Sequence, residues 1–322
     1  MRIVNLDTPS GWRIGAVDGD TVIDLNRALQ LSFAGKRLPG KAEREQADRE
    51  LPATFAGWLA PGLNEAVRTA RRAAEVGAAL VEKHGSAWTA AHQLAWPLAE
   101  AALAPPLSQG GTVLAIGLNY RSHAAEAKME LPKYPMVFTK PQPSVGGPRE
   151  PVAIPKASRR IDYEGEIVIV IGRRCKEIDE ASALSCVAGY TLANDLSARD
   201  WQFRTSEMML GKAFDGFCPM GPWMVTADEL PDIAALTLET RVNGELRQSA
   251  PASDMIFSVA QLVTYLSQVM TLLPGDAILT GTPAGIGATR DPRLWLAPGD
   301  RVEVSAGVLG TLATTLEGTA AR

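Results

Sequence analysis

Two apolar runs without a polar interruption stand out in the pattern of hydrophobic and polar positions along the 322-residue chain. Residues 167–171 are all β-branched, and residues 112–118 form a second apolar run. Runs of this length are typical of strands that are buried on both faces. A third apolar stretch, residues 186–194, ends at Asp195. The pattern therefore predicts three core strands, each followed or preceded by polar residues.

The first hundred residues have a different pattern. Up to about residue 30, short apolar segments alternate with Gly, Asp and Pro, which indicates strands joined by turns. Residues 34–52 are polar and poorly patterned, so they form either a surface loop or a weak helix. From Thr54 to about His84, apolar residues recur at helical spacing and alanine is abundant, which predicts one or two helices. The prolines of the connector at 104–106 predict a boundary between a small N-terminal domain, 1–105, and a main domain, 106–322.

Local signals in the last third complete the predicted fold. Asn243-Gly244 is a signal for a two-residue β-hairpin turn. Residues 254–270 have the pattern of an amphipathic helix, and residues 301–304 belong to a closing hairpin. The predicted class is α+β, mostly β, with a small α/β N-terminal domain.

Composition narrows the classes of function. The chain is 46% hydrophobic and 21% charged, as expected for a globular protein. A net charge of −4 without a basic run argues against nucleic acid, and no segment approaches the ~20 apolar residues of a membrane span. The N-terminus lacks the apolar region of a signal peptide. The three cysteines (Cys175, Cys186 and Cys218) have no metal-type spacing and are predicted to be reduced apolar fillers in a cytoplasmic protein.

The strand at 167–171 begins with acidic residues. Because strands have a period of two, Asp162, Glu164 and Glu166 share one side, and Glu164 and Glu166 lie about 6.6 Å apart along it. Such carboxylates are costly in a core unless a cation lies between them, and oxygen ligands suit Mg²⁺, Mn²⁺ or Ca²⁺. The alternative is an acidic strand mouth in water, paired with Arg159 and Arg160.

A third carboxylate, Asp195, ends the strand at 186–194 and is a candidate third metal ligand. Residues 197–200 look like a capping box that opens a helix, on which Arg199 and Gln202 share one face. Arg199 could hold a substrate carboxylate in a fork. The alternatives are that Asp195 caps the helix and that Arg199 pairs with Asp195 or Glu166.

His123 and Glu126 follow the apolar run at 112–118 and are three residues apart, hence neighbours on one helical face. A carboxylate beside an imidazole orients it and raises its basicity, as the activation of water requires. A surface His–Glu pair is the alternative. Residues 129–135, with two prolines, could form a mobile cover over a cleft or a plain loop.

Lys212 lies in a glycine- and proline-punctuated apolar segment, where it could reach an anion or extend to the surface. Residues 280–287 form a loop rich in Thr and Gly that includes Thr282. Its backbone N–H groups could bind a small carboxylate or oxyanion. The loop lacks the lysine of a phosphate-binding loop, which argues against a nucleotide.

Together these motifs resemble the fumarylacetoacetate hydrolase family, in the family's order and over about residues 105–310. The matching segments are Gly117-Leu118-Asn119-Tyr120 with His123 and Glu126; Asp162-Tyr163-Glu164-Gly165-Glu166; Gly189-Tyr190-Thr191 through Asp195 to Asp200; Gly211-Lys212 with 217–222; Val242-Asn243-Gly244; and Thr280-Gly281-Thr282-Pro283.

The resemblance implies a mixed β-roll catalytic domain in a homodimeric, metal-dependent enzyme. It further implies roles for ten residues. Glu164, Glu166 and Asp195 would hold Mg²⁺, Mn²⁺ or Ca²⁺; His123 and Glu126 would form a water-activating dyad, with Lys212 as a third catalytic residue; Arg199, Gln202, Thr282 and Tyr120 would bind the substrate.

The function that follows is hydrolysis of a carbon–carbon bond in a 2,4-dioxo acid, such as fumarylpyruvate or a sugar-derived diketo acid. His123 would take a proton from water, and Lys212 or Gln202 would stabilise the oxyanion. Cleavage would give pyruvate or a related 2-oxo acid. One alternative is decarboxylation of oxaloacetate or isomerisation of a hydroxymuconate-type diacid, which needs no activated water. Another is a non-catalytic small-acid-binding protein. The His–Glu pair favours hydrolysis.

Overall fold

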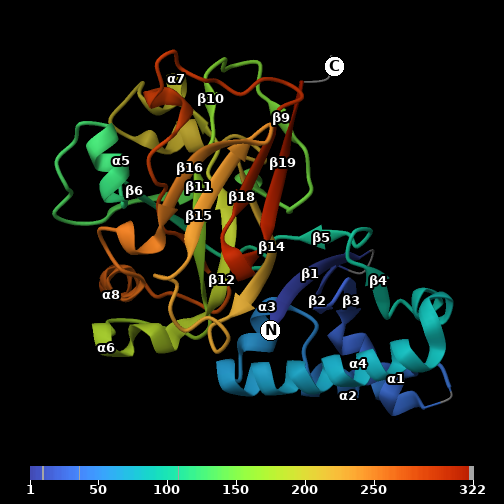
Figure 1. The fold of residues 1–322 in the computed structure, drawn as a ribbon. Helices are drawn as coiled ribbons and strands as arrows, with labels where there is room; N and C mark the ends of the chain where they lie inside the picture. The colour runs from blue at the N-terminus through green and yellow to red at the C-terminus, as the bar shows by residue number, and fades with distance from the viewer. Residues whose placement is uncertain (9–10, 36, 108, 319–322) are drawn as a thin grey trace.

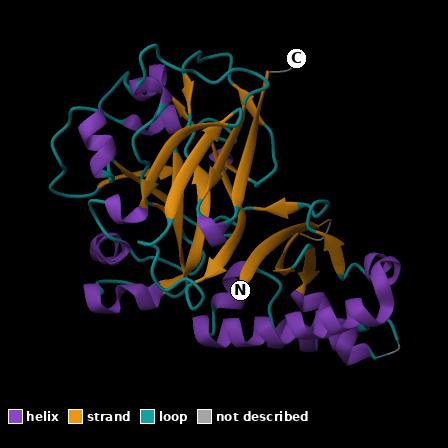
Figure 2. Ribbon diagram, viewed as in Figure 1, coloured by secondary structure: helices purple, strands orange, loops and turns teal. Residues whose placement is uncertain are grey.

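The computed structural model describes residues 1–8, 11–35, 37–107 and 109–318. Two mixed β-sheets form the centre, and the longest helices lie below the sheets in the view of Figures 1 and 2. The larger sheet has the order β4 (Ala95–Pro97), β3 (Thr21–Asp24), β2 (Gly11–Asp18), β1 (Arg2–Thr8), β14 (Cys218–Thr226), β12 (Val187–Asn194), β11 (Gly165–Ile171), β17 (Ala277–Leu279), β6 (Val113–Gly117) and β7 (Met136–Lys140), with β5 (Leu103–Ala104) beside β1 and β8 (Val145–Gly146) beside β14.

The second sheet packs on the first. Its order is β16 (Glu245–Pro251), β15 (Thr237–Val242), β18 (Arg301–Ser305), β19 (Thr311–Gly318) and β9 (Val152–Ile154). A short pair, β10 (Ile161–Asp162) and β13 (Ser197–Ala198), lies apart from both sheets. Most neighbouring strands are antiparallel, whereas β17 pairs with β6 in parallel. This mixture of helices and mixed sheets is the α+β class that the sequence predicts.

The helices are α1 (Leu25–Ala34), α2 (Lys41–Glu50), α3 (Phe55–Leu59), α4 (Leu63–Ala91), α5 (Arg121–Glu126), α6 (Glu180–Ala183), α7 (Arg199–Gln202) and α8 (Val259–Val269). Short 3₁₀ helices lie at Gln142–Ser144, Leu184–Cys186, Met208–Lys212, Ala252–Asp254, Gly287–Thr289 and Gly307–Leu309. None of the helices in the described ranges is long and apolar enough to cross a membrane.

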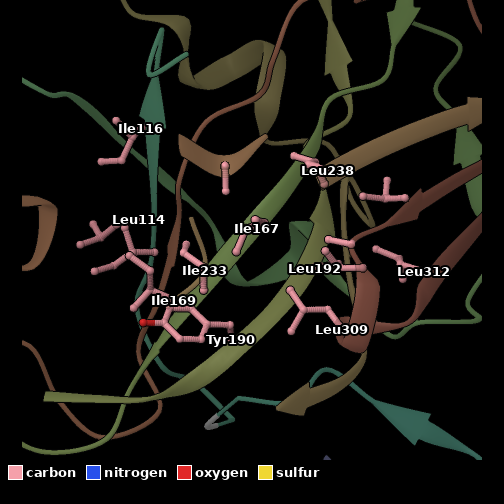
Figure 3. Close-up of a cluster of buried hydrophobic side chains, with 14 of the residues drawn as sticks. Leu114, Ile116, Ile167, Ile169, Tyr190, Leu192, Ile233, Leu238, Leu309 and Leu312 are labelled. Atoms are coloured by element: carbon pink, nitrogen blue, oxygen red, sulfur yellow. The ribbon is translucent and has the colours of Figure 1, made fainter. Parts of the chain in front are cut away.

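Strand β11 is the central element of the core. Ile167, Ile169 and Ile171 enter the main core between the two sheets, where Figure 3 shows Ile169 beside Tyr190 of β12. Val170 points to the other face and joins the cluster formed with the N-terminal helices. All residues of β11 from 167 to 171 are 0% exposed, so the prediction of a strand buried on both faces is confirmed.

The N-terminal strands extend the large sheet, because β1 pairs with β14 through Arg2–Val225 and Ile3–Met224. The predicted helices at 54–84 are α3 and α4, and Gly85 interrupts α4 with non-helical angles (φ 75°, ψ 171°). Within 34–52 the weak-helix alternative is correct, since α2 forms there. The predicted boundary at 104–106 follows β5, which pairs with β1. The division at 105/106 stays a prediction.

Two local predictions on caps and helix ends need correction. The capping box at 197–200 is wrong, because Ser197 belongs to β13 and its Oγ donates to the Asp195 carbonyl oxygen (2.9 Å). Pairing of β13 with β10 holds Ser197 in extended backbone, and helix α7 begins at Arg199 without a side-chain cap. The amphipathic helix predicted from residue 254 begins at Val259, behind a capping box of Ser258 and Gln261. The hairpin at Asn243-Gly244 is confirmed, with both residues at positive φ.

The cysteines are the fillers that the sequence predicts. Cys175, Cys186 and Cys218 are free and buried. Burial raises the pKa of both Cys175 and Cys218 to about 12. These thiols therefore remain protonated at neutral pH.

Candidate active site and metal centre

A cavity of about 460 Å³ opens at the end of the sheet where β11 begins and β12 ends. Helices α5 and α7 and the loop at 280–289 complete its wall. Eight of the ten site residues predicted from the sequence line it: His123, Glu164, Glu166, Asp195, Arg199, Gln202, Lys212 and Thr282. Glu126 and Tyr120 do not. Segments far apart in the sequence thus meet in one place.

The three predicted metal ligands converge because of strand register. Gly165 of β11 pairs with Asn194 of β12, and the Asp195 backbone N–H donates to the Glu164 carbonyl oxygen (2.8 Å). One carboxylate oxygen from each of Glu164, Glu166 and Asp195 lies within 4.8 Å of the other two. Oxygens bound to one Mg²⁺ or Ca²⁺ at about 2.0–2.6 Å have similar separations. These residues fit a hard divalent cation.

Lys212 lies among the carboxylates. Its Nζ donates to Glu164 Oε2 (2.6 Å) and to Asp195 Oδ2 (2.8 Å), and the residue is 2% exposed. The alternative that it extends to the surface is therefore wrong. Lys140 approaches from β7, where its Nζ lies 2.7 Å from Asp195 Oδ1 and also donates to the carbonyl oxygens of Lys212 and Phe217.

Arg199 is held by an acid outside the triad. Its Nε donates to Asp162 Oδ2 (2.9 Å), one terminal nitrogen lies 2.7 Å from Glu164 Oε1, and the other donates to Gln202 Oε1 (2.8 Å). Asp162 also accepts the backbone N–H groups of Gly287 (2.7 Å) and Ala288 (3.0 Å). The partners of Arg199 are therefore Asp162 and Glu164, not Asp195 or Glu166.

The buried cluster carries one excess negative charge. When all of these groups are ionised, four carboxylates (Asp162, Glu164, Glu166 and Asp195) face three cations (Lys140, Arg199 and Lys212), which leaves a net charge of −1. A divalent cation would change this to +1, a charge that suits an anionic ligand.

The two glutamates respond to this environment in opposite ways. Burial disfavours the charged form of Glu164, but Lys212 and Arg199 outweigh it and lower its pKa to about 2. Burial raises the pKa of Glu166 well above its usual range, and the charges of Asp195 and Glu164 add to the effect. The Gly281 N–H, which donates to Glu166 Oε2 (2.6 Å), only partly offsets it. Glu166 is therefore the carboxylate that most needs a cation.

His123 lies in the cavity wall, with Glu126 behind it on α5. His123 Nδ1 and Glu126 Oε2 are 3.5 Å apart, and the Gly285 N–H donates to both Glu126 oxygens (3.0 and 3.1 Å). Burial opposes ionisation of Glu126, yet the contacts with His123 and Gly285 outweigh it and lower its pKa. Glu126 is thus a charged group able to orient the imidazole. Its catalytic role stays a prediction.

Thr282 and Tyr120 have different surroundings. Thr282 Oγ1 donates to the Gly165 carbonyl oxygen (2.9 Å) and accepts from Gln248 Nε2 (2.8 Å), so it ties the glycine-rich loop to β11. Tyr120 is 0% exposed and packs in the main core, where burial raises the pKa of its hydroxyl. Because Tyr120 is outside the cavity lining, its predicted substrate contact has no geometric support here.

Lys140 and Gln248 are two members of the site that the sequence reasoning missed. A period-two pattern offers a signal for Lys140, since it shares a strand face with Phe138, which lines the cavity. Gln248 lies on another strand, and its side-chain oxygen accepts a hydrogen bond from the Gly165 N–H (3.0 Å). Because the two residues are 83 positions apart in the sequence, no local pattern reveals this contact.

The segment predicted as a mobile cover has no regular secondary structure in the described chain. Its apolar residues Met129, Leu131 and Tyr134 are 51%, 56% and 61% exposed, and Met129 lines the cavity. The role of this segment as a cover stays a prediction. Arg159 and Arg160 make no ion pair with the acids of the triad among the described residues, so the alternative of an acidic mouth paired with them is wrong.

Comparison with known proteins defines the class. A model of the fumarylacetoacetate (FAA) hydrolase C-terminal domain matches residues 112–317. The chain belongs to the fumarylacetoacetate hydrolase family of enzymes, as the resemblance of its motifs implies.

Individual relatives show the range of the family. The chain is 36% identical over 274 residues to oxaloacetate tautomerase Fahd2a, mitochondrial, of Rattus norvegicus, covering 85% of this chain and 82% of that protein. Its fold resembles that of 5-carboxymethyl-2-hydroxymuconate delta-isomerase from Mycobacterium smegmatis (TM-score 0.69, 30% identity, 99% and 100% of the two chains). It also resembles fumarylacetoacetate hydrolase from Exiguobacterium antarcticum (TM-score 0.70, 29% identity, 99% of each chain).

Proposed function

We propose that this protein is a divalent-metal-dependent enzyme that moves a proton at the carbon beside the 2-oxo group of a small 2-oxo acid. The observation that carries the proposal is that the carboxylate triad and His123 line one cavity. A cation site beside a general base is the arrangement that enolisation needs, because charge develops on the oxo oxygen as the proton leaves carbon.

Each residue has a role in this proposal. Glu164, Glu166 and Asp195 would hold Mg²⁺, Mn²⁺ or Ca²⁺, which when bound supplies a Lewis acid for the 2-oxo oxygen. His123 takes the proton from C3 and returns it at another position. Glu126 stabilises the imidazolium formed in between. With the divalent cation bound, the net positive charge of the buried cluster favours binding of the substrate carboxylate.

The names of the relatives support a proton shift. The rat relative is named a tautomerase and the mycobacterial one an isomerase. Both kinds of reaction move a proton without loss of atoms.

Hydrolysis of a carbon–carbon bond in a 2,4-dioxo acid is the second candidate, and the pairing of His123 with Glu126 favours it. In this reaction His123 deprotonates water, which adds to the distal carbonyl. Lys212 or Gln202 stabilises the oxyanion. The bond between C3 and the attacked carbonyl carbon C4 then breaks, and its electron pair, left on C3, is protonated to give the 2-oxo acid beside the new carboxylate.

One assay separates these reactions. The Mg²⁺-loaded protein is given oxaloacetate and, separately, acetylpyruvate, while enol absorbance and pyruvate are followed in parallel. Accelerated keto–enol exchange of oxaloacetate without pyruvate supports the proton shift. Pyruvate from acetylpyruvate supports hydrolysis, and pyruvate from oxaloacetate indicates decarboxylation. His123→Ala is expected to lower the proton-shift or hydrolytic rate by about 10²–10⁴-fold, with His84→Ala as the control. Near-full activity of His123→Ala would contradict its role as the base.

The predicted homodimer and the cytoplasmic location stay predictions. Light scattering during size-exclusion chromatography tests the predicted homodimer. The rat relative's name carries the word mitochondrial, so location is open to a separate experiment.

A further inference from the structure

Gln248 of β16 is buried close to the carboxylate triad but lies outside the cavity lining. The residue is 1% exposed and belongs to the second sheet, whereas the triad lies at the ends of strands of the large sheet. A substrate in the cavity therefore does not contact it. Any influence of Gln248 on the site acts through the groups that its amide holds.

Both halves of the Gln248 amide are engaged. Its oxygen accepts the Gly165 N–H (3.0 Å), and its nitrogen donates to Thr282 Oγ1 (2.8 Å) and to the Pro283 carbonyl oxygen (2.8 Å). The Thr282 hydroxyl then donates to the Gly165 carbonyl oxygen (2.9 Å), so this circuit of hydrogen bonds begins and ends on the backbone of Gly165. An inverted amide would place its N–H groups against the Gly165 N–H, so the circuit fixes one orientation.

This circuit holds Glu166 from two sides. Gly165 directly precedes Glu166, so its backbone fixes where the side chain of this ligand begins. Residues 282–283 follow Gly281, whose N–H donates to Glu166 Oε2 (2.6 Å). Gln248 thus connects the strand that carries Glu166 to the loop that holds its carboxylate.

Glu166 depends on this support more than the other two ligands do. Glu164 and Asp195 each accept a hydrogen bond from Lys212 (2.6 and 2.8 Å). Within the described chain, the Gly281 N–H is the one hydrogen-bond donor to the Glu166 carboxylate. Displacement of the loop would therefore leave Glu166 without its donor, while Glu164 and Asp195 keep theirs.

The glycine-rich loop also packs tightly on the strand that carries Gln248. Gly285 has a positive φ of 106°, and a Cβ built there would lie 2.0 Å from the Arg247 carbonyl oxygen and 3.3 Å from Gln248 Cα. Arg290 donates to the same Arg247 carbonyl oxygen (2.7 Å). Because the loop is seated directly on β16, a change in the Gln248 side chain is transmitted to it.

We infer that Gln248 is a positioning residue that raises the affinity of the triad for the divalent cation, because it fixes Glu166 through Gly165 and the loop at 280–283. The inference rests on the proposed function for the presence of that cation. Groups that orient metal ligands from outside the coordination sphere typically change metal affinity by about 10–100-fold when they are removed.

The test measures Mn²⁺ binding, which needs no turnover. Metal-free wild type and Gln248→Met are titrated with Mn²⁺ well below the unfolding temperature, and the electron paramagnetic resonance signal of free Mn²⁺ reports the bound fraction. Methionine is as long as glutamine but has no amide. Gln248→Met is expected to bind Mn²⁺ about 10–100-fold more weakly than wild type.

Asn5→Leu is the matched control. Asn5 is also a buried amide, 1% exposed, and its nitrogen donates to the carbonyl oxygens of Pro105 (2.6 Å) and Leu107 (2.8 Å), away from the cavity lining. Asn5→Leu should lower the unfolding midpoint but change Mn²⁺ affinity by no more than about twofold, since it shares no partner with the triad. Wild-type Mn²⁺ affinity in Gln248→Met, or an equal loss of affinity in the two variants, overturns the inference.

Thr282→Val tests the circuit by a second route, which also serves if Gln248→Met does not fold. It removes the hydroxyl that joins Gln248 to the Gly165 carbonyl oxygen, so it should weaken Mn²⁺ binding as well. In the double variant the loss should be smaller than the product of the two single losses, because the same circuit is broken twice. Unchanged Mn²⁺ affinity in Thr282→Val, or fully multiplicative losses, overturns the inference.

Failure of the proposed function gives a different result. A protein that binds Mn²⁺ in a Gln248-dependent way but shows no proton shift or cleavage retains the positioning role and loses the proposed chemistry. A protein that turns over oxaloacetate or acetylpyruvate, and whose Gln248→Met variant binds Mn²⁺ as tightly as wild type, retains the chemistry and loses the positioning role.

Discussion

Among individual residues, Lys140 has no exposed side-chain surface and holds three acceptors at once. It lies 2.7 Å from Asp195 and donates to two backbone carbonyl oxygens. Lys140→Met keeps the aliphatic part of the side chain but leaves these acceptors without their donor. Breaking one partner of a buried pair typically costs about 3–5 kcal/mol, and we expect a loss of that size in the free energy of unfolding.

The measurement is urea unfolding of metal-free protein, with the exposed Lys156→Met as control. The control should change the free energy of unfolding by less than about 0.5 kcal/mol. A similarly small change in Lys140→Met would show that Lys212 alone compensates Asp195.

Residue patterns in the sequence identified the acids better than their partners. The period of two in a strand placed Glu164 and Glu166 together, and the end of the next apolar run supplied Asp195. The partners could not be found in the same way. Arg199 binds Asp162 because β10 pairs with β13, and Lys140 reaches Asp195 across 55 positions. Such contacts depend on strand register between distant segments, which local periodicity does not encode.

At the level of elements, the geometry of the triad depends on how closely β11 approaches the second sheet. A Cβ built on Gly165, between the two glutamate ligands, would lie 2.1 Å from Thr240 Oγ1 of β15 and 3.1 Å from Val304 of β18. Gly165→Ala should therefore push β11 away from β15. We expect a loss of about 1–3 kcal/mol in the free energy of unfolding, as for other overpacked cores, together with weaker Mn²⁺ binding.

A second substitution tests this cause. Thr240 Oγ1 is buried and has no hydrogen-bond partner within the described chain, so Thr240→Ala alone should cost little. Combined with Gly165→Ala, it should restore part of both the stability and the Mn²⁺ affinity, a non-additive result that a double-mutant cycle measures. Strict additivity would show that the two residues do not compete for the same space.

Over the whole molecule, the class of fold and the core strands were predictable because buried strands have an unmistakable apolar pattern. The placement of the N-terminal part was not. Its strands extend the large sheet through the pairing of β1 with β14, and its helices cover the face that includes Val170. No feature of residues 1–30 identifies β14 as the partner strand, because an edge strand offers backbone groups that any strand of suitable length can pair with.

The charge balance of the buried cluster makes the whole molecule's stability depend on a divalent cation. Because four carboxylates face three cations, Mg²⁺ or Mn²⁺ should bind the folded state in preference to the unfolded chain. At about 100 times the dissociation constant the gain is about 2.7 kcal/mol, which raises the unfolding midpoint by several degrees. Thermal unfolding with metal, then with excess EDTA, measures the gain and its reversal.

The variant Glu166→Gln distinguishes metal binding from a general effect of salt. The contribution of Glu166 to stability also depends on pH, with a definite sign. In metal-free protein the pKa of Glu166 is raised, by burial first and then by Asp195 and Glu164. Its stabilising contribution is therefore fully present below the ordinary glutamate pKa of 4.5 and is lost as pH rises through the raised folded value.

Metal-free wild type should lose stability over that range, while Glu166→Gln, which keeps an acceptor for Gly281, should lose less. Added Mn²⁺ should stabilise wild type most at high pH and the variant hardly at all. If Mn²⁺ stabilised both proteins equally, the cation would bind elsewhere.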